Sequence, residues 1–159
     1  MTFKLATAED APIIHQLMID AFAIYNQTIP SNALEETVQS IQFAMETDGE
    51  RAVICYDKHQ PIAMARFTVK YDSLYFYRLS VLPSYHGKGN AKKVITWLET
   101  YAQERACKRI WCKVRKSVQQ NLYLYRSLGY KIFNEFIVTK EDGTQLDVVS
   151  MEKFLLHSE

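Results

Sequence analysis

The sequence predicts an α+β fold, in which a mixed, mostly antiparallel sheet of about seven strands is flanked by about four helices. Short segments of apolar and aromatic residues, bounded by turn residues, indicate the strands. Apolar residues at three-and-four spacing indicate the helices. A strand, a helix and another strand follow one another around residues 87–106, and such a crossover requires one parallel pair within the sheet.

The first part of the chain predicts one strand and two helices. Residues 2–6 form the expected strand, and Glu9 and Asp10 begin the first helix, whose first turn tolerates Pro12. The apolar face of this helix contains Ile13, Ile14, Leu17, Met18 and Ala21. Residues 32–46 predict the second helix, with an apolar face of Leu34, Val38, Ile41 and Met45.

Three strands are expected next, over residues 52–56, 61–71 and 74–81, and a short turn joins the last two in a hairpin. The third strand is apolar or aromatic at nearly every position except Arg78 and Ser80. An unbroken apolar run is typical of a strand that is covered on both faces. We therefore expect this strand to be central in the sheet.

The last part of the chain predicts two helices and three strands. A long amphipathic helix begins after residue 89, and residues 109–114 predict a strand. A shorter helix over residues 118–128 ends at Gly129, a residue type common at helix C-termini. The strands of the closing hairpin are expected over residues 131–138 and 146–154.

The composition, net charge and cysteines of the chain limit the kinds of protein it can be and the partners it can have. With 48% hydrophobic and 23% charged residues, residues 1–159 are expected to form a single domain. The net charge of +1 and the lack of an apolar run of about 18 residues or a signal peptide favour neither nucleic acid nor membrane as a partner. Cys55, Cys107 and Cys112 contain no C-x-x-C pair, which favours free thiols in a reducing cytoplasm and no metal site.

The most informative segment covers residues 81–91, where a strand ends, a proline follows, and Gly87 and Gly89 lead into the long helix. Free amides at the start of a helix, beside glycines, bind phosphate. The segment is no kinase-type loop, because Asn90 follows Gly89, and it lacks the third glycine of a dinucleotide fingerprint. It matches [QR]-x-x-G-x-[GA], except that His86 replaces Arg or Gln. The alternative to a phosphate site is a glycine-rich turn that only begins the helix.

This segment resembles the cofactor-binding element of the GNAT superfamily of acetyl-CoA-dependent N-acetyltransferases. Residues 121–130 are similar to the late N…Y…GY element of that family, and residues 6–10 are similar to its common start. The resemblance implies a GNAT fold and an acyltransferase that moves an acetyl group from acetyl-CoA to a primary amine. It further implies direct transfer in a ternary complex, with acetyl-CoA as co-substrate and no metal.

The resemblance also implies roles for individual residues. The amides from Gly87 to Ala91 would bind the pyrophosphate of CoA, and the backbone N–H of Val81 would polarise the thioester carbonyl. Tyr125 matches the tyrosine that protonates the departing sulfur; a core tyrosine is the alternative reading, and Tyr123 is an alternative donor. The expected CoA-binding residues are Leu79, Ser80, Val81, His86, Gly87, Lys88, Gly89, Asn90, Ala91 and Asn121. Asn121 has a second reading, as the cap of its helix.

Several points stay open in the sequence. The central strand contains no glutamate, so no general base is assigned. Arg78 and Arg66 either anchor an acidic group of the acceptor or pair with carboxylates in the core. The acceptor is a small-molecule or peptide amine, and residues around 22–30 are expected near it. A homodimer is one expectation, because such pairs are common among similar proteins. A non-catalytic sensor that binds acyl-CoA is the alternative function.

Overall fold

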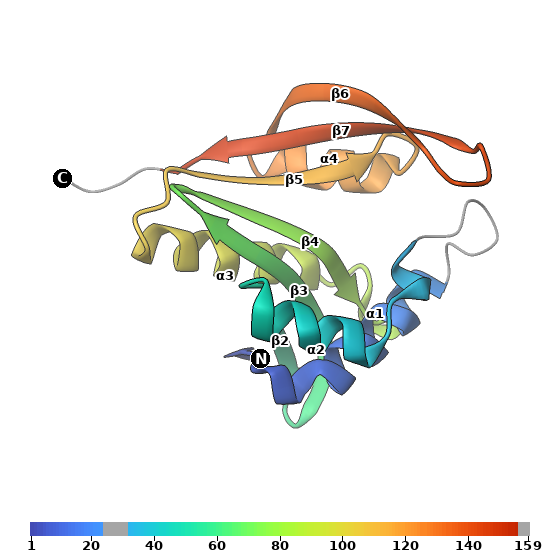
Figure 1. Cartoon of the computed structure of the whole chain (residues 1–159). Helices are drawn as coiled ribbons and strands as arrows, with labels where there is room; N and C mark the ends of the chain where they lie inside the picture. Colours follow the sequence, from blue (N-terminus) through green and yellow to red (C-terminus); the bar gives the residue numbers. More distant parts are fainter. Residues whose placement is uncertain (24–31, 156–159) are drawn as a thin grey trace. The chain divides into compact units, whose positions relative to one another are not determined.

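The computed structural model describes residues 1–23 and 32–155, and its elements follow the predicted order (Figure 1). The expected acceptor segment around 22–30 therefore lies largely outside the described residues. The strands are β1 (Thr2–Leu5), β2 (Arg51–Asp57), β3 (Gln60–Lys70), β4 (Ser73–Val81), β5 (Arg109–Arg115), β6 (Lys131–Thr139) and β7 (Gln145–Phe154). The helices are α1 (Ala11–Phe22), α2 (Val38–Thr47), α3 (Asn90–Glu104) and α4 (Gln119–Ser127), with short 3-10 turns η1 (Ala8–Asp10), η3 (Asn32–Glu35) and η4 (Pro83–Tyr85).

The strands form a seven-stranded sheet in the order β1-β2-β3-β4-β5-β7-β6. β4 and β5 are the parallel pair that the crossover requires, and the pairs β1–β2, β2–β3, β5–β7 and β6–β7 are antiparallel. The predicted α+β fold with a mixed, mostly antiparallel sheet is confirmed, and so is the central place of β4.

The chain divides into two compact units. The first contains residues 1–68 and 76–98, and the second contains residues 69–75 and 99–159. In the part of the chain that the structure describes, no helix is both long and apolar enough to cross a membrane. The single domain over residues 1–159 stays a prediction.

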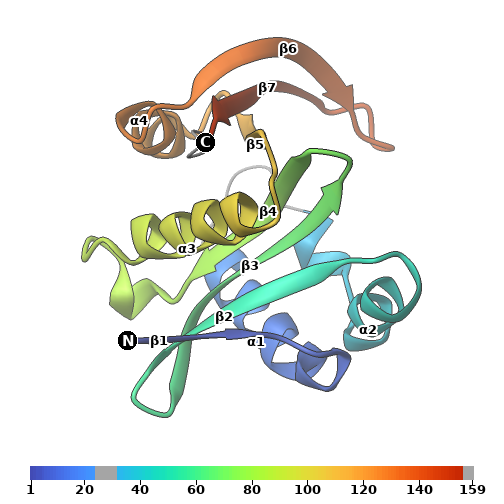
Figure 2. The ribbon, with the colours of Figure 1, turned by 90° about the vertical axis from the view of Figure 1, so that its left-hand side faces the viewer.

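In the first unit, helices cover both faces of strands β1–β3 (Figure 2). One face packs against α1 and α2 in a cluster of buried residues: Ala11, Ile14, Leu17, Met18, Ala33, Ile41, Ala52, Ile54 and Met64. On the other face, Phe67 of β3 contacts Trp97 of α3, with ring centroids 6.3 Å apart. The strand residues alternate between these faces because successive side chains point to opposite sides of a sheet.

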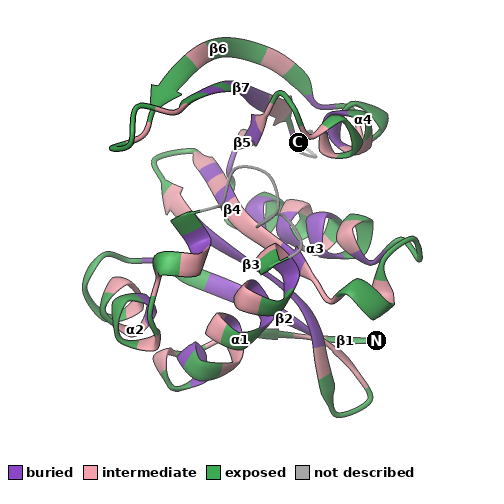
Figure 3. Cartoon of the chain, turned by 90° about the vertical axis from the view of Figure 1, so that its right-hand side faces the viewer, coloured by how far each residue is buried: buried purple, intermediate pink, exposed green. Residues whose placement is uncertain are grey.

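In the second unit, α4 contributes the buried residues Leu122 and Tyr125. Ile110, Cys112 and Val114 alternate along β5 and are also buried. β6 is exposed at most positions (Figure 3). The hairpin β6–β7 matches the predicted one, with Val138 paired to Leu146 next to the turn. Cys55, Cys107 and Cys112 are free and buried, and burial raises the pKa of each thiol.

Two predictions about the elements are corrected. The single helix expected over residues 32–46 is divided, because Thr37 is the N-cap of α2: the amide of Ser40 donates to Thr37 Oγ1 at 3.0 Å and the amide of Thr37 donates to Ser40 Oγ at 2.9 Å. Both faces of β4 were expected to be covered, but only one of them has fully buried residues. Its buried residues are Leu74, Phe76 and Ser80, and the other positions are half-buried.

Candidate active site

The connection from β4 to α3 has the backbone that its glycines predict. Gly87 and Gly89 have φ values of 72° and 78°, in the left-handed region. A side-chain carbon added at either position would meet no atom within 4 Å. The backbone conformation, and not a lack of space, is therefore what requires glycine at these two positions.

The amides after this turn are free of backbone partners. Within the described residues, the N–H groups from Gly87 to Lys92 donate to no main-chain carbonyl, and the first bond of the helix joins the amide of Lys93 to the oxygen of Gly89 at 3.1 Å. The first amides of any helix lack partners inside the helix and form its positive end. The loop therefore presents an exposed group of donors suited to an anion.

Two side chains fix this loop to the strand and turn before it. His86 Nε2 lies 2.8 Å from the carbonyl oxygen of Val81, and because a carbonyl only accepts, Nε2 bears the hydrogen. Asn90 is buried and its amide donates to the oxygen of Tyr85 at 3.0 Å. Lys88 Nζ lies 5.5 Å from the centroid of the Tyr85 ring. His86, the one departure from the pattern, and Asn90 thus both bind the backbone immediately before the loop.

β4 is irregular immediately before this loop. Arg78 has a φ of 53°, a left-handed conformation that is uncommon for a residue other than glycine. Ser80, which is buried, donates its hydroxyl to the oxygen of Arg78 at 2.8 Å. Leu79 and Val81 are half-buried, and Ser80 is the one residue of these three that faces the core.

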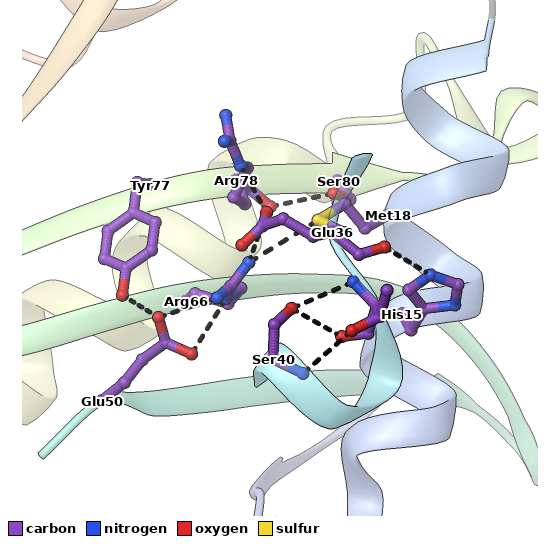
Figure 4. A network of polar contacts seen from close by, with 10 residues as sticks. His15, Met18, Glu36, Ser40, Glu50, Arg66, Tyr77, Arg78 and Ser80 are labelled. Carbon is purple, nitrogen blue, oxygen red and sulfur yellow. Dashed lines mark hydrogen bonds and ion pairs between the residues drawn. The ribbon is translucent and has the colours of Figure 1, made fainter. Parts of the chain in front are cut away.

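Arg66 and Arg78 form a charged network with two glutamates in the first unit (Figure 4). Arg66 is buried and makes two hydrogen bonds to Glu50, Nε to Oε2 at 3.0 Å and Nη2 to Oε1 at 2.9 Å. Its Nη1 donates to Glu36 Oε2 at 2.8 Å, and Arg78 Nε donates to the same oxygen at 3.0 Å. The Tyr77 hydroxyl donates to Glu50. Both arginines therefore pair with carboxylates, as one of the two sequence readings expected.

Burial by itself lowers the pKa of the Arg66 guanidinium, but the charges of Glu50 and Glu36 outweigh it and raise that pKa. Arg66 is thus charged, and each of its three nitrogens donates to Glu50 or Glu36, so its charge is balanced within the network. Glu36 and Glu50 were missed in the sequence because they lie outside the family motifs. The only available signal was indirect, since a buried arginine requires a carboxylate somewhere in the chain.

The second unit contains the other two predicted site residues, Tyr125 and Asn121. Tyr125 is buried, and its ring centroid lies 5.8 Å from that of Tyr130. Tyr123, its alternative, is 78% exposed. Asn121 does not cap the helix as one reading expected, because α4 begins after Val118 and no side chain caps it. Asn121 is the third residue of α4, and its contact with a cofactor stays a prediction.

Tyr130, whose ring packs beside that of Tyr125, belongs to a partly buried polar cluster in the second unit. Lys153 Nζ donates to Glu99 Oε1 at 2.7 Å, and the Tyr130 hydroxyl donates to Glu99 Oε2 at 3.3 Å. Burial and the charge of Glu99 both raise the pKa of Tyr130. The Tyr130 hydroxyl is therefore neutral at pH 7 and can donate this hydrogen bond.

A shallow recess of about 340 Å³ lies on β5, β6 and β7, in the second unit. Lys113 Nζ lies 5.6 to 5.9 Å from the centroids of three rings, those of Tyr75, Trp111 and Phe136. The Arg109 guanidinium stacks near Trp111 and pairs with Glu152 at 3.0 Å. Trp111 also packs against rings, since its centroid lies 4.3 Å from that of Tyr75 and 6.0 Å from that of Phe133. Among the described residues, no three His, Cys, Asp or Glu side chains form a metal-binding group.

The combination of this sheet with a glycine loop of free amides after β4 has a counterpart among known proteins. The sequence profile of the acetyltransferase (GNAT) family matches residues 14–130, well over half of the chain. The chain belongs to this family. It is therefore an acyltransferase by class, and acetyl-CoA is the acetyl donor that the family uses.

Individual GNAT proteins are similar over part or all of the chain. The ribosomal protein bS18-alanine N-acetyltransferase of Haemophilus ducreyi is 31% identical over 99 residues, which are 59% of this chain and 66% of that protein. The chain thus matches just under two thirds of that relative's length.

Solved structures show the same fold. The ribosomal-protein-S18-alanine N-acetyltransferase from Escherichia coli has a TM-score of 0.79 at 19% identity, over 99% of this chain and 96% of that chain. A putative acetyltransferase from Salmonella typhimurium, solved with its cofactor acetyl-CoA, has a TM-score of 0.77 at 18% identity, over 100% of this chain and 96% of that chain.

Proposed function

We propose that this GNAT protein transfers an acetyl group from acetyl-CoA to a primary amine, directly and within a ternary complex. The unpaired amides of residues 87–91 are the observation on which the proposal rests. Left-handed glycines, a helix N-terminus and open space beside Gly87 and Gly89 fit a pyrophosphate. We assign Lys88 to the rim of this site as a further positive charge.

The other binding residues follow from the same assignment. The backbone of Leu79, Ser80 and Val81 is proposed to bind the pantetheine arm, and Asn121 to add a side-chain contact. Acetyl-CoA, when bound, supplies an acyl group already activated as a thioester. The proposed role of the Val81 N–H is to stabilise negative charge on the carbonyl oxygen of that group.

Tyr125 is proposed to hold the proton that the leaving sulfur receives. A tyrosine has an ordinary pKa of about 10 and a thiol of about 8.5, so complete transfer between unperturbed groups is uphill by about 2 kcal/mol. Donation of a hydrogen bond from the Tyr125 hydroxyl avoids most of this cost. The burial of Tyr125 supports the role, because a hydrogen bond in a water-excluded place is stronger than one in solvent.

A protein N-terminus is the first acceptor to test. The name of the Haemophilus ducreyi relative gives an alanine of ribosomal protein bS18 as its acceptor. Alanine has no amine in its side chain, so the nitrogen that can be acetylated is the α-amine at a chain start. We propose the cytoplasm as the location, since three buried free thiols suit a reducing compartment.

The test is release of CoA thiol by the purified protein with acetyl-CoA and a panel of amines, which includes peptides that begin with alanine. Direct transfer predicts thiol release only when an acceptor is present. Acetyl-CoA at about 100 times its Kd should also add about 2.7 kcal/mol of stability, whereas ATP should add none. If acetyl-CoA stabilises the protein but no amine causes thiol release, the result would contradict the proposed acetyl transfer and favour a sensor.

A further inference from the structure

Arg78 and Glu36 both have unused hydrogen-bonding groups, and these lie side by side in the first unit. Arg78 uses Nε for Glu36, and its two terminal nitrogens have no partner among the described residues. Glu36 accepts both of its bonds at Oε2, so Oε1 accepts none within the same part of the chain. The terminal nitrogens of Arg78 point away from the network (Figure 4). The two side chains are 29% and 25% exposed, so a ligand can reach them.

The backbone of Arg78 is held in a conformation that costs free energy. Its φ of 53° interrupts the alternation of β4. In an unbroken strand, neighbouring residues point to opposite faces, but Tyr77 and Arg78 both contact the glutamates of one network. Strained residues of this kind persist where a fold holds a side chain in place for binding or catalysis.

The charges of the network restrict what can bind there. Arg66 and Arg78 balance Glu36 and Glu50, so the network is neutral overall. An anion alone would leave this half-buried site negative, and a dianionic phosphate would do so more strongly. A ligand with one carboxylate and one ammonium keeps the site neutral. The flat guanidinium edge suits a carboxylate, and the free carboxylate oxygen suits an ammonium.

We infer that Arg78 and Glu36 bind a zwitterionic acceptor, in which a carboxylate lies next to the amine. Arg78 binds the carboxylate and Glu36 Oε1 accepts a hydrogen bond from the ammonium before that group loses its proton. The acceptor is then a free α-amino acid, or a peptide N-terminus followed by an acidic residue. The inference rests on the proposed transfer to an amine, and it specifies the chemical class of that amine.

A binding experiment tests this inference without any turnover of acetyl-CoA. Alanine and alaninamide share the amine, but only alanine has a carboxylate. We expect the wild-type protein with CoA to bind alanine about 10- to 100-fold more tightly in an NMR titration. Arg78→Gln should remove this preference, whereas Arg105→Gln, at an exposed arginine of the second unit, should keep it. Equal binding of both ligands by the wild type, or a preference that survives in Arg78→Gln, overturns the inference.

Kinetics supply a second measurement. The ratio of kcat/KM for Ala-Glu peptides to that for Ala-Gln peptides should fall about tenfold or more in Arg78→Gln. Arg78→Lys keeps the positive charge but loses the forked guanidinium, so its kcat/KM ratio should lie between those of the wild type and Arg78→Gln. This variant also serves as the test if Arg78→Gln folds poorly. An unchanged ratio counts against the inference. If alanine binds selectively but no amine causes thiol release, the proposed function fails while the carboxylate site stands.

Discussion

The amide of Tyr130 donates to the carbonyl oxygen of Tyr125 at 2.9 Å, at the end of α4. Gly129 lies between them with a φ of 95°, and its amide donates to the oxygen of Arg126 at 3.0 Å. These two bonds, with the left-handed glycine, are a Schellman motif. The Gly-Tyr end of the family element is therefore the structural stop of the helix on which Tyr125 lies.

Gly129→Ala should lower the free energy of unfolding by about 1 kcal/mol. The added carbon would lie 3.7 Å from Lys153 Cε, an ordinary contact, so the loss comes from the backbone alone. Gly129→Asn should lose less, since asparagine tolerates this conformation better. Urea unfolding measures all three proteins. Equal stability of the alanine variant and the wild type would show that this helix end is not strained by a side chain.

Tyr125→Phe should lower kcat about 100-fold or more, because the proposed proton donor is lost, while acetyl-CoA still binds. Tyr123→Phe is the matched control on the same helix, and its exposed ring predicts little change in rate. Steady-state rates of both variants with one acceptor decide between the two tyrosines. A slow Tyr123→Phe and a normal Tyr125→Phe would reverse the assignment.

Gly89→Asp should weaken acetyl-CoA binding strongly, because it adds an anionic side chain next to the proposed pyrophosphate site. Gly49→Asp is a close control: Gly49 also has a left-handed φ, of 73°, with no atom within 4 Å of an added side-chain carbon. Both variants should lose similar stability, but only Gly89→Asp should lose affinity in a calorimetric titration. Equal affinity of the two would argue against the loop as the binding site.

Asp10→Asn should destabilise the protein by about 1 kcal/mol at pH 7 and by less at about pH 3. Burial by itself raises the pKa of Asp10, but the amide of Thr7, at 2.9 Å, and the bond and charge of Lys4 outweigh it and lower that pKa. A lowered folded-state pKa stabilises the protein above the unfolded pKa of about 3.9 and loses this effect as the pH falls through the folded value. Urea unfolding at both pH values measures the difference. A constant difference would mean that the charge of Asp10 contributes nothing.

Local signals predicted most of the elements, and the helix boundary that was missed depends on a local cap. Gly129 and Pro12 marked helix ends that the structure confirms, since each acts within one turn of its own helix. The division of the helix expected over residues 32–46 depends on Thr37 and Ser40, whose reciprocal bonds outweigh the helical period of the apolar residues around them. The sequence contained this signal in a weak form, because serine replaces the usual glutamate of the motif.

The carboxylates of the site could not be found in the same way. Glu36 and Arg78 are 42 positions apart in the sequence, and no periodicity relates them. The left-handed backbone of Arg78 was equally hidden, because arginine gives no hint of a conformation that glycine usually marks. The loop of residues 87–91 was visible beforehand because its chemistry depends on the backbone alone, which two glycines reveal directly.

The burial of Cys55, Cys107 and Cys112 makes the protein convenient for site-directed labelling. Burial keeps these thiols protonated, and a protonated, inaccessible thiol reacts slowly with maleimides. A cysteine introduced at Tyr71, which is fully exposed, can therefore receive a fluorophore while the native three stay in place. Ligand binding could then be followed by fluorescence without first preparing a cysteine-free background.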